Sequence, residues 1–146
     1  MKKVFIVGGT SGFGLSLAKK FNLDHEVTVC GRKKYSMFNG VVCDMLNISE
    51  NIFQEHNPDI IINNAFDKKD YLKSYQGSLN VLKSAFSFFK SKNEGTIINV
   101  NSISGVCPDP KDPDYAAAKY ALRGYSDSIS AEAFQKNIKI INLYPR

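Results

Sequence analysis

Three side chains in the second half of the chain have the types and spacing that acid–base chemistry needs. Tyr115 and Lys119 are four residues apart, so on a helix both project from one face. A phenol is a weak acid with a pKa of about 10, and a neighbouring ammonium stabilises its phenolate form. Ser102 can donate a hydrogen bond to a carbonyl oxygen. Such Tyr/Lys pairs are also common on ordinary helices, so the pair needs support from the rest of the chain.

Together these residues predict hydride transfer to a carbonyl group. Ser102 would polarise the carbonyl oxygen, Tyr115 would protonate the developing alkoxide, and Lys119 would assist Tyr115. The hydride itself would come from a nicotinamide cofactor, because no side chain supplies one.

The stretch from Val4 to Gly14 has the composition of a phosphate-binding turn. An apolar run, Val4–Val7, precedes glycines at positions 8, 9, 12 and 14, and apolar residues at helical spacing follow. This order predicts a buried strand, a tight turn and a helix N-terminus, whose free amides attract anions. The G-x-x-x-G-x-G spacing is neither the G-x-G-x-x-G fingerprint nor a Walker loop. Taken alone, the stretch could also be an ordinary glycine-rich turn.

Two further strand ends carry residues suited to adenosine. Gly31-Arg32-Lys33 follows an alternating strand, Glu26–Cys30, at the point where an acidic residue would select NAD and an arginine accepts the 2′-phosphate of NADP. We therefore expect NADP(H), although a solvated basic turn is the alternative. Asp44 follows the short strand 41–43 and could accept a hydrogen bond from the adenine amino group, or serve as a turn or cap residue.

The elements that position these residues alternate between strand and helix. Besides the segments above, we expect helices at 48–56, 69–91 and 115–134, and strands at 59–62, 96–100 and 138–143. Asp112 or Asp114 can cap the last helix. The alternation predicts an α/β fold, a Rossmann-type doubly wound parallel sheet with strand order 3-2-1-4-5-6, in one NADP-binding domain over residues 1–146. The cofactor should lie across the carboxyl ends of the strands.

Composition narrows the class of protein. The net charge of +5 comes from dispersed Lys and Arg residues, which does not suit a nucleic-acid-binding module. No apolar run has membrane-spanning length, and the chain leads straight into a strand without a signal peptide. The three cysteines, Cys30, Cys43 and Cys107, lack metal-ligand spacing and are expected to be reduced thiols in a cytoplasmic protein. Both His25 and His56 are expected at the surface.

These motifs together resemble the short-chain dehydrogenase/reductase family, in its short single-domain branch. The resemblance rests on GGTSGFG at 8–14, GR at 31–32, CD at 43–44, NNA at 63–65, INVNSISG at 98–105, YAAAK at 115–119 and ALRGYSDSISAE at 121–132. It implies that Ser102, Tyr115 and Lys119 are catalytic, and that Lys119 also binds the nicotinamide ribose. The cofactor contacts that it implies are Gly8, Thr10, Ser11, Gly12, Phe13, Gly14, Arg32, Asp44, Asn63, Ala65, Tyr115, Lys119 and Pro145.

Three positions depart from the family pattern. Phe66 replaces the glycine of NNAG and would crowd the cofactor. Ser74 stands where an asparagine usually holds a water molecule of the proton relay. After Pro145-Arg146 the family continues with a substrate-covering loop, helices and a seventh strand, all lacking here. We therefore expect an exposed sixth strand and either a truncated chain or cover from another chain.

The resemblance also implies a homodimer or homotetramer that forms through the helices on either side of the fifth strand. Ala117, Ala121 and Gly124 make a stripe of small residues that would permit close approach, and Phe86, Phe88 and Phe89 cannot all face the sheet. The alternative is that the alanines pack on the chain's own sheet.

Two functions fit these observations. The first is an NADPH-dependent oxidoreductase that acts on a small ketone, aldehyde or alcohol, with no metal, nucleic acid or membrane involved. The second is a non-catalytic NADP-binding sensor or scaffold with the same fold, which Phe66, Ser74 and the early C-terminus favour.

Overall fold

Strand β1 (Lys3–Val7) lies at the centre of the sheet, because its apolar residues can be covered on both faces. Val4, Phe5, Ile6 and Val7 are all buried, as the continuous apolar run predicts for an inner parallel strand. β1 pairs in parallel with a strand on each side, so that Val7 is level with Cys30 and Asn63. Three strand ends therefore meet beside the glycine turn.

The computed structural model describes all 146 residues and contains one six-stranded parallel sheet. The strand order is β3-β2-β1-β4-β5-β6, which confirms the predicted Rossmann-type topology. The remaining strands are β2 (Glu26–Gly31), β3 (Val41–Val42), β4 (Ile60–Asn63), β5 (Gly95–Val100) and β6 (Ile138–Leu143).

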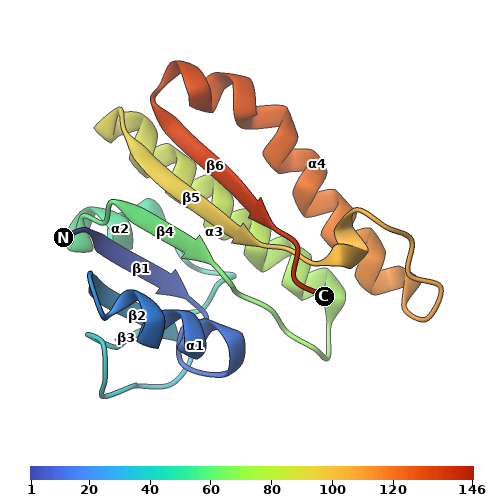
Figure 1. The fold of residues 1–146 in the computed structure, drawn as a ribbon, viewed down its shortest axis with the longest axis horizontal. Coiled ribbons are helices and arrows are strands. Elements are labelled where there is room, and N and C mark those ends of the chain that lie inside the picture. The colour runs from blue at the N-terminus through green and yellow to red at the C-terminus, as the bar shows by residue number, and fades with distance from the viewer.

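Helices cover both faces of the sheet, unequally. The helices are α1 (Gly12–Phe21), α2 (Glu50–His56), α3 (Tyr71–Lys92), α4 (Pro113–Gln135) and the short 3₁₀ helix η1 (Ile103–Gly105). Ile6 and its alternate neighbours pack on α1, whereas Phe5 and its alternate neighbours pack on α2, α3 and α4. Figure 1 shows α1 in front of the sheet and the three other α-helices on the opposite side.

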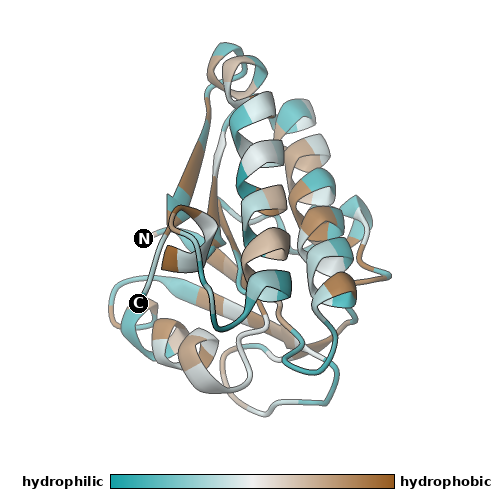
Figure 2. Cartoon of the chain, turned by 90° about the vertical axis from the view of Figure 1, so that its right-hand side faces the viewer, coloured by the Kyte–Doolittle hydropathy of each residue, from teal (hydrophilic) through white to brown (hydrophobic).

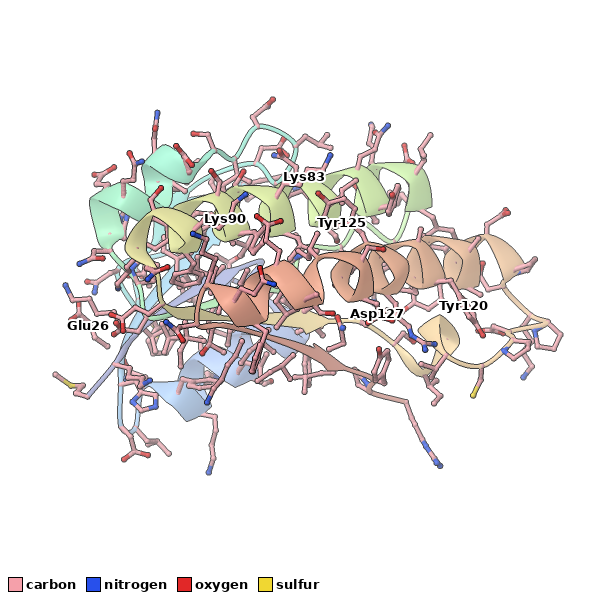
Figure 3. The ribbon with its side chains drawn as sticks, turned by 90° about the horizontal axis from the view of Figure 1, so that it is seen from above. Glu26, Lys83, Lys90, Tyr120, Tyr125 and Asp127 are labelled. Atoms are coloured by element: carbon pink, nitrogen blue, oxygen red, sulfur yellow. A yellow bond between two sulfur atoms is a disulfide. The ribbon has the colours of Figure 1, made fainter.

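The long helices α3 and α4 stand side by side on the same face of the sheet (Figure 2). Lys90 Nζ of α3 lies 3.3 Å from Glu132 Oε1 of α4, and Lys83 Nζ lies 5.4 Å from the centre of the Tyr125 ring. Figure 3 shows Lys83 and Tyr125 next to each other between these helices. These contacts join the middle and the C-terminal parts of α3 and α4.

Phe88 is buried by another helix of the same chain and is not left free for a partner. Phe86, Phe88 and Phe89 are all buried. The ring centres of Phe88 and Phe53 are 6.2 Å apart, because α2 lies beside α3 and covers the residue that points away from the sheet. The small residues Ala117, Ala121 and Gly124 are exposed, so they do not pack on the chain's own sheet.

Asp112 is the residue that caps α4. Its Oδ1 accepts a hydrogen bond from the amide of Tyr115 at 3.1 Å, which satisfies one free donor of the first turn. Its Oδ2 accepts a hydrogen bond from the Tyr71 hydroxyl at 2.6 Å, and this bond raises the pKa of Tyr71. The cap therefore also joins the starts of α3 and α4.

The expectation of reduced thiols is wrong for two of the three cysteines. Cys30 and Cys43 are in disulfide contact, with Cα atoms 5.7 Å apart, because adjacent strands bring them together; only Cys107 is free. His56 is half-buried, with its ring 5.4 Å from that of Phe5. Leu72, in the first turn of α3, is 66% exposed.

No helix of the chain combines the length and the apolar character that a membrane crossing requires.

Candidate active site

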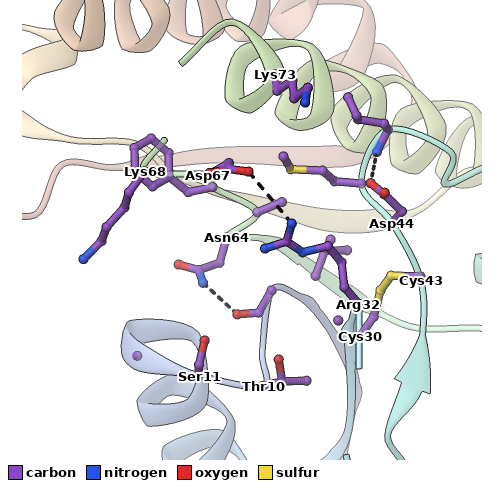
Figure 4. Close-up of a pocket in the computed structure, with 18 of the residues that line it drawn as sticks. Thr10, Ser11, Cys30, Arg32, Cys43, Asp44, Asn64, Asp67, Lys68 and Lys73 are labelled. Atoms are coloured by element: carbon purple, nitrogen blue, oxygen red, sulfur yellow. Dashed lines mark hydrogen bonds and ion pairs between the residues drawn. A yellow bond between two sulfur atoms is a disulfide. The ribbon is translucent and has the colours of Figure 1, made fainter. Parts of the chain in front are cut away.

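A cavity of about 480 Å³ lies at the carboxyl ends of β1, β2 and β4 (Figure 4). This volume falls within the range of small-molecule and cofactor sites. The structure brings together at this cavity most of the predicted cofactor residues, namely Gly8, Thr10, Ser11, Gly12, Phe13, Arg32, Asp44 and Ala65. The place agrees with the general rule that open α/β sheets bind ligands beyond their strand ends, where the strand order reverses.

The glycine turn has two positions at which a side chain is excluded for different reasons. Gly12 starts α1 with φ +52°, and the space beside its Cα is open toward the cavity. Gly14 is buried and lies so close to β1 that an added Cβ would contact the carbonyl oxygen of Gly8. Gly14 therefore permits close packing of α1 on the strand, whereas Gly12 leaves room for a ligand at the helix N-terminus.

Asn64 secures the far side of this turn. Its Nδ2 donates a hydrogen bond to the carbonyl oxygen of Gly8 at 3.0 Å, and its amide donates to Val7 O at 3.1 Å. The loop after β4 is thus fixed to the loop after β1, and the cavity has a rigid floor.

Arg32 extends into the cavity mouth and meets an acidic residue there. Its Nη1 lies 3.9 Å from Asp67 Oδ2, and the side chains of Arg32 and Asp67 are 76% and 23% exposed. The other carboxylate oxygen of Asp67 accepts a hydrogen bond from the amide of Lys69 at 2.9 Å, so the carboxylate is held in place. Figure 4 shows this pair spanning the cavity.

Sequence reasoning missed Asp67 together with Lys68 and Lys73, which also line the cavity. A signal was present, because the charged run DKKD follows the strand end at Asn63 within a few residues. A strand end in a parallel sheet of this topology is where ligand contacts are expected.

Asp44 is a turn residue that also lies at the cavity. Its Oδ1 accepts a hydrogen bond from the amide of Leu46 at 2.9 Å, which is the geometry of a turn residue. It also lines the cavity, beside Cys43 and Met45 (Figure 4). The second carboxylate oxygen makes no hydrogen bond within the chain and is free to accept one from a ligand.

Asn63 and Pro145 do not reach the cavity. The Nδ2 of Asn63 donates to Ser78 O at 2.8 Å and to Asn99 Oδ1 at 3.0 Å, inside the layer between β4 and α3. The carbonyl oxygen of Pro145 accepts a hydrogen bond from the amide of Ile103 at 3.0 Å. That these two residues contact the cofactor directly remains a prediction.

None of Ser102, Tyr115 and Lys119 lines this cavity; Tyr115 and Lys119 lie together on α4, and Ser102 stands at the end of β5. Ser102 follows β5 and caps η1, accepting a hydrogen bond from the amide of Ser104 at 3.2 Å while its own hydroxyl proton stays available. Asn101 ties this strand end to α4, because its Nδ2 donates to the carbonyl oxygen of Lys119 at 3.2 Å. The strand end and the helix face that carry the three residues are thus joined.

Lys119 is a buried cation. It is 7% exposed, and burial lowers the pKa of Lys119 to about 8. Its Nζ donates to Val100 O at 3.3 Å and lies 5.7 Å from the centre of the Tyr115 ring. The helix thus places an ammonium beside the Tyr115 ring.

Ser74 holds the β4–α3 loop. Its Oγ accepts a hydrogen bond from the amide of Asp67 at 2.6 Å and donates one to the carbonyl oxygen of Asp67 at 2.7 Å. The hydroxyl proton is therefore already used, which leaves Ser74 poorly suited to the proton relay considered from the sequence.

A sequence model of the short chain dehydrogenases matches residues 44–146, which is well over half of the chain. The chain belongs to the short chain dehydrogenase family. This family of oxidoreductases is the one that the glycine turn and the Ser102, Tyr115 and Lys119 set resemble, and the match confirms that expectation.

Relatives and solved structures of this family extend the comparison. The chain is 25% identical to a 3-ketodihydrosphingosine reductase of Bacteroides thetaiotaomicron over 97% of its own length and 62% of the relative's, so it spans about three fifths of that protein. A gluconate 5-dehydrogenase from Burkholderia cenocepacia, in complex with NADP and tartrate, superposes with a TM-score of 0.83 at 21% identity, over 99% of this chain and 70% of that one.

A third similar protein was solved with a different cofactor. It is a 4-hydroxyisoleucine dehydrogenase complexed with NADH, with a TM-score of 0.78 and 25% identity, covering 99% of this chain and 75% of that one. One similar structure thus holds NADP and another holds NADH.

Proposed function

We propose that this short chain dehydrogenase is an NADP(H)-dependent oxidoreductase that transfers a hydride between the nicotinamide and a small ketone, aldehyde or alcohol. The observation that carries the proposal is the cavity, which has anion-binding amides of the glycine turn on one side and Arg32 at the other. Residues 1–146 would form its nucleotide-binding domain.

The residues at the cavity fit a dinucleotide. The open space beside Gly12 lets a pyrophosphate approach the helix N-terminus, and the free carboxylate oxygen of Asp44 suits an adenine amino group. Arg32 presents a guanidinium, which matches a 2′-phosphate better than a 2′-hydroxyl. When bound, the cofactor would supply or accept the hydride.

The chain's own residues would handle the proton and the substrate oxygen. The Ser102 hydroxyl would donate a hydrogen bond to the substrate carbonyl oxygen, and Tyr115 would deliver its proton to that oxygen as negative charge develops. Lys119, whose ammonium lies 5.7 Å from the Tyr115 ring centre, would stabilise the phenolate left behind. In the alcohol-oxidising direction Tyr115 would act as the base.

Turnover tests this proposal. We expect NADPH oxidation in the presence of a panel of ketones and aldehydes, and a loss of at least about 100-fold in kcat for Tyr115→Phe. The dissociation constant for NADPH should stay within about twofold in that variant, because the ring is retained and only the proton donor is removed. Equal turnover by both forms would contradict the role of Tyr115.

A non-catalytic NADP-binding sensor or scaffold is the second candidate. The observation that favours it is the position of Phe66, which lies between the cavity and the Tyr115–Lys119 pair. Such a protein would bind NADPH and turn over none of the substrates of the panel, in wild type and Tyr115→Phe alike.

We further propose that the chain forms a homodimer or homotetramer through the outer surface of α3 and α4. The support is the exposed stripe of Ala117, Ala121 and Gly124, which would let another helix approach closely.

A further inference from the structure

Phe66 is the residue that separates the large cavity from the candidate catalytic group. It lines the cavity of about 480 Å³, and it also lines a much smaller one of about 10 Å³ beside Lys119 and Ser78. Ser102, Tyr115 and Lys119 are absent from the wall of the large cavity. The open space therefore begins at the adenosine end and stops at the Phe66 ring.

The Phe66 ring is held by neighbours on the catalytic side. Its centre is 5.5 Å from that of Tyr115 in an edge-on arrangement and 6.1 Å from that of Tyr71 in a stacked one. The ammonium of Lys119 lies 5.0 Å from the ring centre, within the range of a cation–π contact. The ring thus covers the groups that a nicotinamide and its ribose would have to reach.

The main chain around Phe66 leaves the side chain as the part that can move. Asp67, its neighbour, is fixed to Ser74 through both its amide and its carbonyl group. Asn64 on the other side is fixed to Gly8 and Val7. Phe66 itself is only half-buried, so rotation about its side-chain bonds would turn the ring toward solvent without unfolding the loop.

We propose that Phe66 determines whether the nicotinamide end of a dinucleotide reaches Tyr115 and Lys119, and that with the ring in place the cavity accepts the phosphorylated adenosine end alone. This inference rests on the proposed function, because it takes the cavity to be a dinucleotide site. A phenyl ring at this position makes the adenosine half the main source of affinity and places a conformational step before hydride transfer.

The test compares two ligands that share one end. Adenosine 2′,5′-bisphosphate carries the adenosine half without the nicotinamide, whereas NADPH carries both. In wild type the two dissociation constants should agree within about threefold, and NADPH should show little change in nicotinamide fluorescence. In Phe66→Gly we expect NADPH to bind about tenfold more tightly with enhanced fluorescence, while the affinity for the bisphosphate stays unchanged.

Two further variants make the result decisive. Phe66→Ala repeats the opening with less backbone freedom, in case the glycine variant folds poorly, and Phe66→Leu, which keeps bulk but loses the ring contacts, should fall between wild type and Phe66→Ala in its affinity for NADPH. If NADPH already binds wild type much more tightly than the bisphosphate, and Phe66→Gly and Phe66→Ala do not change the ratio, the role of Phe66 is wrong while the dinucleotide site stands. If neither ligand binds any form, the proposed function itself fails, and the role of Phe66 with it.

Discussion

Lys119, a candidate catalytic residue, carries a buried positive charge that lowers the stability of the folded protein. The ammonium is buried against the Phe66 and Tyr115 rings and makes one hydrogen bond, to Val100 O. Burial without a carboxylate partner disfavours the charged form, which is why the pKa of Lys119 falls to about 8. Below that pKa the folded protein contains a poorly solvated charge that the unfolded chain would hydrate.

Replacing this cation should stabilise the protein. We expect Lys119→Met to raise the free energy of unfolding at pH 7 by about 2 kcal/mol, since about 1.4 kcal/mol corresponds to each unit by which the pKa is displaced and the lost hydrogen bond offsets part of the gain. Between pH 8 and 10.5, the ordinary pKa of a lysine, the unfolded chain holds more protons at this site, so wild type should gain stability with rising pH and the variant should not. Chemical denaturation at several pH values measures both effects, with the exposed Lys111→Met as control.

A wild-type stability that does not rise between pH 8 and 10, or a Lys119→Met variant less stable than wild type at pH 7, would contradict the description of Lys119 as a destabilising buried cation.

Asp67 would compete with a bound 2′-phosphate for Arg32 at the cavity mouth. If Arg32 binds a 2′-phosphate, its ion pair with Asp67 at 3.9 Å must be broken or shared, and the carboxylate also repels the phosphate. We expect Asp67→Asn to strengthen NADPH binding by about twofold to fivefold, the modest size reflecting the exposure of Arg32. Affinity for NADH should not change, and a parallel gain for NADH would show that Asp67 acts on the shape of the site instead.

Two helix glycines, one closely packed and one open to solvent, allow a test of how closely α1 must pack on the sheet. In α1, a Cβ on Gly14 would collide with the Gly8 carbonyl, whereas Gly124 in α4 has nothing within 4 Å of that position. We expect Gly14→Ala to lower the free energy of unfolding by about 2–3 kcal/mol and Gly124→Ala to raise it by about 0.5–1 kcal/mol. Thermal or urea unfolding of the two variants measures both changes in the free energy of unfolding. A Gly14→Ala protein as stable as wild type would mean that α1 does not depend on close approach to β1.

The sequence predicted elements well where a single periodicity determines them. The apolar runs of β1 and β4 and the helical spacing in α3 located each element to within two residues, and alternation along the chain was enough for the sheet order. Gly12 and Asp44 were found because strand ends in this topology meet at one edge.

Lateral contacts between elements were harder to predict. The burial of Phe88 depends on where α2 lies beside α3, and the contact of Cys30 with Cys43 depends on how β3 pairs with β2. Likewise, the sequence indicated that Phe66 is unusual but not that its ring would stack beside Tyr71 and cover Lys119. Such contacts depend on distances across the fold, which periodicity along one element does not encode.

On the scale of the whole molecule, the sheet is covered unequally. Ile141 and Leu143 of β6 are substantially exposed at the edge of the sheet, while the opposite face is covered by α2, α3 and α4. The chain spans about three fifths of the first reductase to which it was compared.

Self-association is the prediction that belongs to this scale. If the outer surface of α3 and α4 forms the proposed dimer, Ala121→Arg should shift the sedimentation coefficient at micromolar concentration toward that of a monomer, because a long charged side chain would stand in the contact. Ser16→Arg, on the opposite face of the sheet, adds the same charge and should leave association unchanged. A wild-type chain that sediments as a monomer at all concentrations would remove this proposal.

The central claim is that the cavity at the strand ends binds a dinucleotide through its 2′-phosphate, and titration of wild type and Arg32→Ala with NADPH and NADH tests it most directly. The account predicts that wild type prefers NADPH, and that Arg32→Ala weakens NADPH binding by about tenfold or more while changing NADH affinity by less than about twofold. Equal loss for both cofactors, or a wild type that prefers NADH, would contradict it.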